Sequence, residues 1–553
     1  MLSLLEENTD TIFGYPGGAI MPVFDSLYDY MDRFNYILAR HEQGAVHMAQ
    51  GYARVTRKTG VAIVTSGPGA TNTLTGLADA MVDSTPLVCI AGQVGSSLLG
   101  TDAFQEIDII GMSMPITKWN FQITSPEEIP QAIAKAFYIA RSGRPGPVLL
   151  DFTKDAQLGT LDFKYKPCNF IRSYIPAPNI RMESIIQAAE AFNSATRPLV
   201  LAGQGLLISQ AENEFKEFVE KTGVPVATTL MGLSSLPTDH PQNLGMLGMH
   251  GYYGPNMMTN EADLIIALGM RFDDRVALNV SKFAAQAKII HFEIDPAEVS
   301  KNIKAHIPVL GSLKDTLPIF TKLCKNRTFP EWMQKYKTYA DIEYTKVIKP
   351  LLYPPQDSAI TMAETIEAVN EYTKGSAIVV TDVGQQQMLA ARYAKLNNAR
   401  SFVTSGGLGT MGFGLPASIG AKIGAPEKEV VLFVGDGGIQ MTLQEFGTIM
   451  ESKVGVKVVI LNNSYLGMVR QWQELFHSKR YSSTPMMSPA FITLASAYGI
   501  SGEKVNERKL LKDAVNRMFN TEGAFLLEVT VEPTDNVFPM IPAGKPVEEI
   551  RFE

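Results

Sequence analysis

Short apolar runs recur along the whole chain and alternate with longer segments whose apolar residues follow a helical period. The runs are apolar at successive positions instead of alternating with polar residues, which is typical of strands buried in parallel sheets between helices. Examples are GVAIVTSG, PLVCIAGQ, PLVLAGQG, DLIIALG, AIVVTDVG, VVLFVGDG and KVVILNN. The pattern predicts an α/β protein built from doubly wound parallel sheets.

Two stretches with several prolines and no periodicity are predicted to be linkers, residues 164–179 and 326–358. They divide the chain into predicted domains at 1–165, 180–325 and 358–553. IVTSGPGATNTLTGLADA (63–80) resembles FVTSGGLGTMGFGLPASIGA (402–421). Either the first and third domains share one fold, or a common strand–glycine–helix pattern matches by chance.

Composition narrows the class of protein. With 553 residues, 45% of them apolar, the chain is long enough for about two to four globular domains. Its net charge of −7 and the absence of an arginine-rich face argue against nucleic-acid binding, and no apolar run is long enough to span a bilayer. Three distant cysteines and seven scattered histidines disfavour disulfides and zinc sites and indicate a reducing compartment. We expect a cytoplasmic protein, or an organellar form from which the transit peptide has been removed.

Two predicted strands end on polar residues. Asp436 follows VVLFVG, and Asn463 follows KVVILN, the next strand along the chain. A right-handed crossover places these strands side by side, so that both side chains meet at the carboxyl edge of the sheet. A carboxylate and an amide oxygen suit Mg²⁺, and the surrounding glycines let the backbone approach a diphosphate. Taken alone, GDG is usually a turn and NN usually opens a loop, but together they predict a metal–diphosphate site.

This pair of segments resembles the thiamine-diphosphate motif, which implies metal binding by Asp436, Asn463 and the carbonyl of Tyr465. The resemblance extends over nearly the whole chain. RHEQGAVHMAQGYAR, TSGPGATN, GTDAFQEIDIIG, SGRPGPVLLDFTKD, RFDDRV, DVGQQQM, SGGLGTMGFGLPA and GMVRQWQ are similar to the catalytic subunits of the acetohydroxyacid (acetolactate) synthase family. The family implies three domains: pyrimidine-binding at 1–165, a central FAD-associated Rossmann-like domain at 180–325, and diphosphate-binding at 358–553.

The family resemblance also implies a reaction. Pyruvate is decarboxylated on thiamine diphosphate, and the hydroxyethyl carbanion is joined to pyruvate or 2-ketobutyrate, in the first common step of isoleucine, valine and leucine synthesis. The implied cofactors are thiamine diphosphate, Mg²⁺ and a largely structural FAD. The implied partners are further copies, in a homodimer or homotetramer, and a small regulatory subunit. The alternatives are an FAD-dependent pyruvate oxidase, an FAD-free catabolic acetolactate synthase and a non-catalytic nucleotide-binding or scaffold protein.

The resemblance assigns roles near the reacting centre. Glu42 would promote the imino form of the cofactor's pyrimidine; without the resemblance it would be a surface helix cap. Gln105 would lie near the reacting centre with Phe104 as a pocket wall, unless TDAFQE only caps a helix. Lys154 would stand at the substrate entrance, with a solvated surface lysine as the alternative.

Three residues are assigned to the second substrate. Arg275 would bind its carboxylate through the guanidinium fork. Met468 and Trp472 would accommodate the extra methyl group of 2-ketobutyrate, where a hydrophobic slot discriminates by roughly 1–3 kcal/mol per methylene. Trp472 as a plain core residue is the alternative.

The remaining cofactor contacts fall into two sets. Thiamine diphosphate would contact Tyr15, Pro16, Gly17, Glu42, Gly384, Gln385, Gln386, Gly409, Met411, Gly435, Asp436, Gly437, Gly438, Asn463, Tyr465, Leu466, Gly467 and Met468. FAD would contact Arg144, Gly203, Gln204, Gly205, Met246, Leu247, His250, Gly269, Arg271, Asp273, Arg275, Glu293 and Asp295.

Some of these positions carry alternatives or departures from the family. Met411 would hold thiamine bent or, alternatively, is a core methionine. Gln386 stands where the family commonly has histidine, and Ser312 where it usually has aspartate, which puts a proton-transfer role and one adenosine contact in doubt. The C-terminal NVFPMIPAGKPVEEI is expected to fold over the active site.

Overall fold

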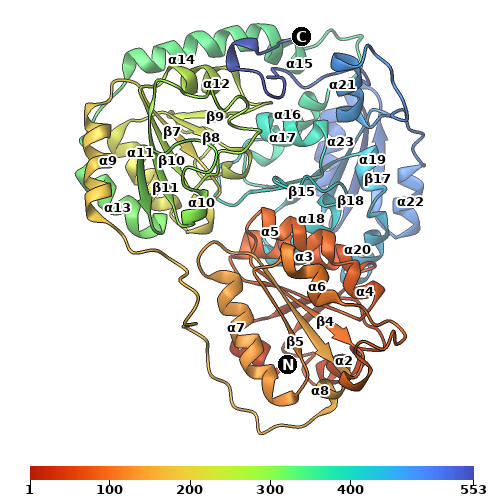
Figure 1. The fold of residues 1–553 in the computed structure, drawn as a ribbon. Helices are drawn as coiled ribbons and strands as arrows, with labels where there is room; N and C mark the ends of the chain where they lie inside the picture. The colour runs from red at the N-terminus through yellow and green to blue at the C-terminus, as the bar shows by residue number, and fades with distance from the viewer.

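Three six-stranded sheets organise the computed structural model, which describes residues Met1–Glu553 (Figure 1). Every strand pair within the sheets is parallel. Strands such as β3, β4 and β15 are buried along nearly their whole length, as continuous apolar runs require when helices cover both faces. The predicted α/β class with three sheet domains is therefore confirmed.

The first sheet lies in the lower part of Figure 1. Across it run β2 (Asn35–Leu38), β1 (Thr11–Gly14), β3 (Gly60–Val64), β4 (Leu87–Gln93), β6 (Pro147–Thr153) and β5 (Trp119–Ile123). Its helices are α1 (Leu2–Glu6), α2 (Met21–Tyr28), α3 (Glu42–Thr56), α4 (Pro68–Thr71), α5 (Leu74–Val82), α6 (Ile109–Ser113), α7 (Ile129–Arg141) and α8 (Lys154–Leu158).

The central sheet has the strand order of a dinucleotide-binding fold. Across it run β12 (Ile307–Leu310), β11 (Lys288–Glu293), β10 (Leu264–Leu268), β7 (Pro198–Ala202), β8 (Val226–Thr228) and β9 (Asn243–Met246). Its helices are α9 (Met182–Ser194), α10 (Gly205–Ile208), α11 (Glu212–Thr222), α12 (Tyr253–Glu261) and α13 (Leu313–Leu323). The strand order reverses between β7 and β10, and ligands of such sheets bind at that switch point.

The third sheet lies on the right of Figure 1. Across it run β14 (Phe402–Val403), β13 (Ile378–Thr381), β15 (Val430–Gly435), β16 (Lys457–Asn462), β18 (Phe525–Thr530) and β17 (Ser501–Val505). Its helices are α16 (Met362–Thr373), α17 (Gln385–Tyr393), α18 (Gly414–Gly424), α19 (Asp436–Ile439), α20 (Phe446–Ser452), α21 (Gly467–Phe476), α22 (Phe491–Ala497) and α23 (Arg508–Asn520).

The first and third sheets have the same topology. In each, the strands run second, first, third, fourth, sixth, fifth when numbered along the chain. The two domains therefore share one fold, which was one of the two interpretations of the internal sequence match. The matched residues are nevertheless not equivalent, because 63–80 follows the third strand of its sheet and 402–421 the second strand of its own.

The two predicted linkers differ in structure. Residues 159–181 contain no helix or strand beyond a bridge between Ile171 and Tyr174. Residues 326–358 are largely helical, which the sequence analysis did not predict, and form α14 (Pro330–Glu343), a π-turn (Tyr344–Ile348) and α15 (Lys349–Leu352). Pro330 occupies the first turn of α14, where a helix tolerates it, and Pro350 is the second residue of α15, directly after the π-turn.

The first and third domains of one chain share a buried core in which α3 crosses α18. Gly51 faces Ala417 at this crossing and Gly420 faces Met48. A methyl group at either glycine would overlap a backbone oxygen of the other helix, so the glycines permit the close approach. The crossing fixes how the two sister domains sit on each other.

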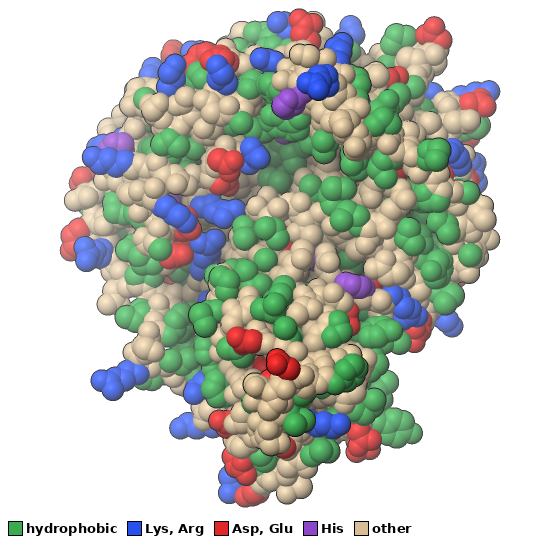
Figure 2. All heavy atoms as spheres, turned by 45° about the vertical axis from the view of Figure 1, so that its right-hand side comes forward, with side chains coloured by type: hydrophobic (Ala, Val, Ile, Leu, Met, Phe, Trp, Pro, Cys, Tyr) green, Lys and Arg blue, Asp and Glu red, His purple; other side chains and the backbone are tan.

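The surface in Figure 2 has a recess with hydrophobic side chains at its base and lysine and arginine side chains beside it.

None of the helices has the combination of length and apolar character needed to cross a bilayer.

Candidate active site

Asp436 and Asn463 follow neighbouring parallel strands, as the crossover rule predicted. β15 pairs with β16, with Gly435 opposite Leu461, and each polar residue comes directly after its strand. Burial raises the pKa of Asp436 above its ordinary value, and the Ser488 hydroxyl and the nearby backbone N–H groups oppose that shift.

One oxygen of Asp436 lacks a partner. Ser488 Oγ donates to Asp436 Oδ2 at 2.9 Å, whereas the buried Oδ1 accepts no hydrogen bond. An unpaired buried carboxylate oxygen is costly unless a cation or a donor fills the position, so this oxygen fits a metal ligand. No cluster of three or more His, Cys, Asp or Glu side chains suits a metal anywhere in the structure. A cation here would therefore rely on amide and carbonyl oxygens and on phosphate.

Asn463 is held in place by two contacts. Its Oδ1 accepts from the N–H of Tyr465 at 3.1 Å, and its Nδ2 donates to Gln385 Oε1 at 3.3 Å. Gln385 in turn donates to Gln471 of α21. The end of β16, the start of α17 and the middle of α21 are thus joined beside Asp436.

Asp382 was not predicted as a site residue, although it follows the buried strand β13 in the same way as Asp436 follows β15. Asp382 accepts hydrogen bonds from the N–H groups of Val383, Gly412 and Gly414 at 2.8–3.1 Å. Burial raises the pKa of Asp382 to about 6, against those hydrogen bonds. The residue fixes the turn that carries Met411.

A single cavity of about 820 Å³ lies where the three domains meet. Thiamine-assigned residues that line it are Gly384, Gly409, Met411 and Met468, and Trp472, which was assigned to the second substrate, lines it too. Flavin-assigned residues that line it are Arg144, Gln204, Gly205, Met246, Leu247, His250, Gly269, Arg271, Asp273, Arg275 and Glu293. Gly203 and Asp295 do not line it, but Gly203 lies directly against Gly269 and Asp295 pairs with Arg144 at 3.4 Å.

The central-domain part of the cavity follows the switch point of the sheet. The Gly203–Gly205 turn follows β7, and Gly269, with φ +55°, follows β10. Burial raises the pKa of Glu293 at the end of β11 to about 7. Arg144 reaches across from the first domain and pairs with Glu298 at 2.8 Å. Ser312, where the family usually has aspartate, also lines the cavity and caps α13.

The C-terminal tail packs against α21 and the rim of the cavity. The N–H of Val537 donates to Gln471 Oε1 at 2.8 Å, and the N–H of Ile541 donates to the carbonyl of Met249, a cavity residue. The tail therefore steadies the helix that carries Met468 and Trp472.

A second group of assigned residues lies outside this cavity, around the carboxyl edge of the first sheet. This group comprises Tyr15, Pro16, Gly17, Glu42, Phe104, Gln105 and Lys154. Glu42 begins α3 and is only 9% exposed, and Asn72 Nδ2 donates to its Oε2 at 2.9 Å. Phe104 is 89% exposed, and Gln105 is held at φ +61°.

Other assigned residues surround Asp436 without lining the cavity: Gln385, Gln386, Gly435, Gly437, Gly438, Asn463, Tyr465, Leu466 and Gly467. The Gln386 side chain is buried against Gly384 and Gly435. The single chain therefore gathers the flavin-type residues with Gly384, Gly409, Met411, Met468 and Trp472 in one cavity, which Asp436, Asn463, Glu42 and Gln105 do not line.

Comparison with known proteins gives matches over nearly the whole chain. The N-terminal TPP-binding domain of thiamine pyrophosphate enzymes matches residues 1–112, their central domain matches 185–319, and their C-terminal TPP-binding domain matches 382–529. The acetolactate synthase large subunit of Lactococcus lactis is 45% identical, covering 98% of this chain and 93% of its own length. The isozyme 2 large subunit of Escherichia coli is 43% identical, covering 98% and 96%, and the large subunit IlvB1 of Mycobacterium tuberculosis is 43% identical, covering 99% and 90%.

Proposed function

This chain belongs to the acetolactate synthase large subunits, a family of thiamine pyrophosphate enzymes, and from that premise we propose how its own residues divide the reaction. The chain is a thiamine-diphosphate-dependent acetolactate synthase of branched-chain amino-acid synthesis. Its substrates are pyruvate and, as the alternative second substrate, 2-ketobutyrate. The observation that carries the assignment is the unpaired Oδ1 of buried Asp436 beside Asn463 at two adjoining strand ends.

Asp436, Asn463 and the carbonyl of Tyr465 hold Mg²⁺, which binds the cofactor's diphosphate. Thiamine diphosphate, when bound, supplies the carbon nucleophile that attacks the keto carbon of pyruvate. Met411 supports the thiamine, in a turn that Asp382 holds in place.

Glu42 acts on the pyrimidine. Its buried carboxyl would form a hydrogen bond with the ring nitrogen, and Asn72 keeps the other carboxyl oxygen in place. Gln105 and Phe104 stand at the reacting centre, and Lys154 at the substrate entrance.

The second substrate lies among residues of the cavity. Arg275 binds its carboxylate, and Met468 and Trp472 form the slot for its alkyl group. The other end of the same cavity holds FAD, because Arg144, Gln204 and Glu293 surround the switch point of a dinucleotide-type sheet. The reaction has no net redox change, so the flavin acts as a structural group.

The chain works as a homodimer or higher homo-oligomer together with a small regulatory subunit. Three observations support this: Glu42 and Gln105 do not share the cavity with Trp472, Phe104 is exposed, and the relatives are named large subunits. Residues 1–165 form the pyrimidine-binding domain, 180–325 the flavin domain and 358–553 the diphosphate domain.

The test is acetolactate formation from pyruvate by the purified chain, with thiamine diphosphate, Mg²⁺ and FAD each left out in turn. We expect activity only when all three are present. Full activity without thiamine diphosphate or Mg²⁺ would overturn the metal–diphosphate assignment, and full activity in flavin-free protein would overturn the flavin assignment.

A further inference from the structure

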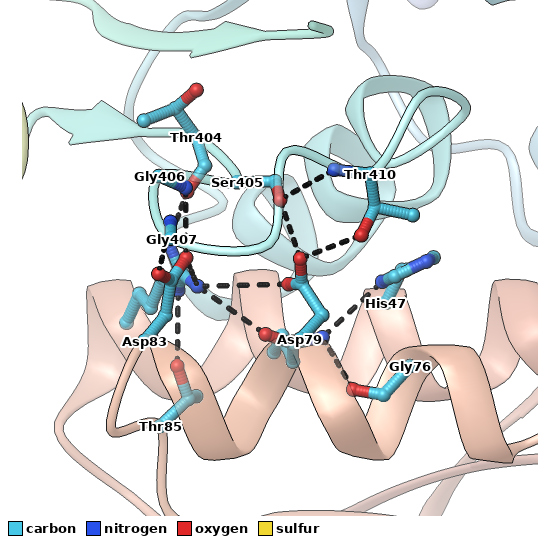
Figure 3. A network of polar contacts seen from close by, with 12 residues as sticks. His47, Gly76, Asp79, Asp83, Thr85, Thr404, Ser405, Gly406, Gly407 and Thr410 are labelled. Atoms are coloured by element: carbon cyan, nitrogen blue, oxygen red, sulfur yellow. Dashed lines mark hydrogen bonds and ion pairs between the residues drawn. The ribbon is translucent and has the colours of Figure 1, made fainter. Parts of the chain in front are cut away.

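Two buried carboxylates at the end of α5, Asp79 and Asp83, accept hydrogen bonds from the loop of residues 405–410 in the third domain (Figure 3). Asp83 accepts from the N–H groups of Gly406 at 2.9 Å and Gly407 at 2.7 Å. Asp79 accepts from the hydroxyls of Ser405 and Thr410, the latter at 2.8 Å. Both aspartates are at most 2% exposed. Charge-assisted bonds in such a setting are stronger than neutral ones and define the loop conformation.

Arg54 of α3 completes the contact between the first and third domains. Its guanidinium pairs with Asp83 at 2.9 Å and donates to the carbonyl of Thr404. One cation thus faces two buried carboxylates. Burial raises the pKa of Asp83, while Arg54 opposes that shift.

The loop that these residues hold forms one wall of the cavity. Gly406, Gly407, Leu408, Gly409 and Met411 all line it. Gly409 and Met411 are assigned to thiamine. The hydrogen bonds of Asp79 and Asp83 therefore fix the position of the loop that forms the thiamine end of the cavity.

The same segment also contacts the flavin end. Gln204 Nε2 donates to the carbonyl of Asp83 at 2.9 Å, and Arg144 Nε donates to Ser84 Oγ at 2.9 Å. Ser84 has φ +54°, an uncommon conformation for a residue other than glycine, which surrounding contacts must maintain. Asp83 and Ser84 themselves line the cavity. Residues 83–84 are therefore bonded on one side to the flavin-assigned residues and on the other to the thiamine-assigned loop.

We propose that Asp83 is a positioning residue that couples the two cofactor-binding ends of the cavity. A ligand that orders Gln204 and Arg144 fixes residues 83–84, and Asp83 then fixes the Ser405–Met411 loop at the thiamine end. The inference rests on the proposed function, in which FAD and thiamine diphosphate occupy these two ends. In this proposal the flavin, which undergoes no net redox change, orders the Ser405–Met411 loop at the thiamine end of the cavity. Because linkage between two binding equilibria is reciprocal, each cofactor must increase the affinity for the other by the same factor.

The experiment measures the dissociation constant of thiamine diphosphate, with Mg²⁺, in flavin-free and in FAD-saturated protein, and that of FAD with and without thiamine diphosphate. Calorimetry and quenching of tryptophan fluorescence serve as readouts, so no activity is needed. In the wild type we expect FAD to tighten thiamine diphosphate by roughly tenfold, and the reverse. In Asp83→Asn, which keeps the shape but replaces one of the two acceptor oxygens by an NH₂ group that cannot accept from the Gly406 or Gly407 N–H, the factor should fall toward one.

A second pair of variants covers the case in which Asp83→Asn does not fold. Thr410 is absent from the cavity wall, and its hydroxyl reaches the network only through Asp79. Thr410→Val removes the hydroxyl and should reduce the coupling factor, whereas Thr410→Ser keeps the hydroxyl and should restore it.

Asp151→Asn is the matched control for general damage. Asp151 is a buried carboxylate of the same domain that accepts from Gln93 and Gln122 and contacts neither the loop nor the cavity. Its variant should keep the coupling factor even if its melting temperature falls.

The outcomes separate the two proposals. Wild-type protein that fails to bind FAD or thiamine diphosphate would overturn the proposed function. Protein that binds both without mutual tightening would overturn the inference, as would unchanged coupling in Asp83→Asn and Thr410→Val, or an equal loss in Asp151→Asn.

Discussion

At the scale of the residue, the site depends on polar atoms that the chain buries at strand ends. Asp436 Oδ1 is the clearest case, since its neighbour Oδ2 is satisfied by Ser488 and it is not. Polar atoms without partners inside a protein cost free energy of folding, so a position of this kind indicates a ligand.

Asp436→Ala or Asn463→Ala should abolish Mg²⁺-dependent binding of thiamine diphosphate, because each removes a metal ligand. The loss of affinity should exceed the roughly 10–100-fold that is typical when a residue that only hydrogen-bonds a metal ligand is changed. Ser488→Ala is the control, since it removes only the hydrogen bond to the other oxygen of Asp436 and should cost less. Calorimetric titration with and without Mg²⁺ measures the effect. Normal affinity in either alanine variant would show that the metal lies elsewhere.

Trp472→Leu should reduce the preference for 2-ketobutyrate over pyruvate as second substrate far more than it slows pyruvate decarboxylation. A methylene in a hydrophobic slot is worth roughly 10–200-fold in preference. Phe476→Leu is the matched control, because Phe476 lies one turn further along α21, packs on Trp472 and does not line the cavity. Products are counted with both ketoacids in competition, and a product ratio unchanged in Trp472→Leu would refute the slot.

At the scale of the element, sequence patterns predicted what is local and missed what depends on contacts distant in sequence. The strands and the adjacency of Asp436 and Asn463 follow from buried apolar runs and the handedness of crossovers. The bonds of Asp382 to residues 412–414 and of Asp83 to 406–407 join segments whose meeting only the tertiary fold decides. The helices of segment 326–358 were not predicted because first-turn prolines resemble helix breakers.

The crossing of α3 and α18 gives a prediction of its own. Gly420→Ala should gain up to about 1 kcal/mol of helix propensity. It should still lower the free energy of unfolding, by about 1–3 kcal/mol net, because the new methyl group overlaps a backbone oxygen of Met48, which cannot rotate away. Gly455→Ala is the control, since its methyl group would meet only ordinary contacts. Thermal and urea unfolding compare the two, and equal stability would mean that the helices can separate at no cost.

At the scale of the whole molecule, the residues proposed for catalysis are divided between two sister domains of one chain. Glu42 belongs to the first domain, Asp436 and Asn463 belong to its sister fold, and none of the three lines the cavity of the single chain. Two-fold pairing of chains would set each pyrimidine half against a diphosphate half of the partner and produce two equivalent sites. The folding of one chain alone does not require this arrangement, so neither the sequence periodicity nor the core of a single chain predicts it.

Mixing two inactive variants tests the pairing. Glu42→Ala and Asp436→Ala are each expected to be inactive alone, but after subunit exchange a mixed dimer contains one site with wild-type Glu42 from one chain and wild-type Asp436 from the other. Random pairing makes half of the dimers mixed, and half of their sites are intact, so activity should recover to about a quarter of wild type. Mixing two separate preparations of Glu42→Ala is the control and should recover nothing. If exchange is demonstrated by mass spectrometry and the first mixture also stays inactive, each chain builds its site alone, and the exposed Phe104 must then have a role other than facing a partner's cofactor.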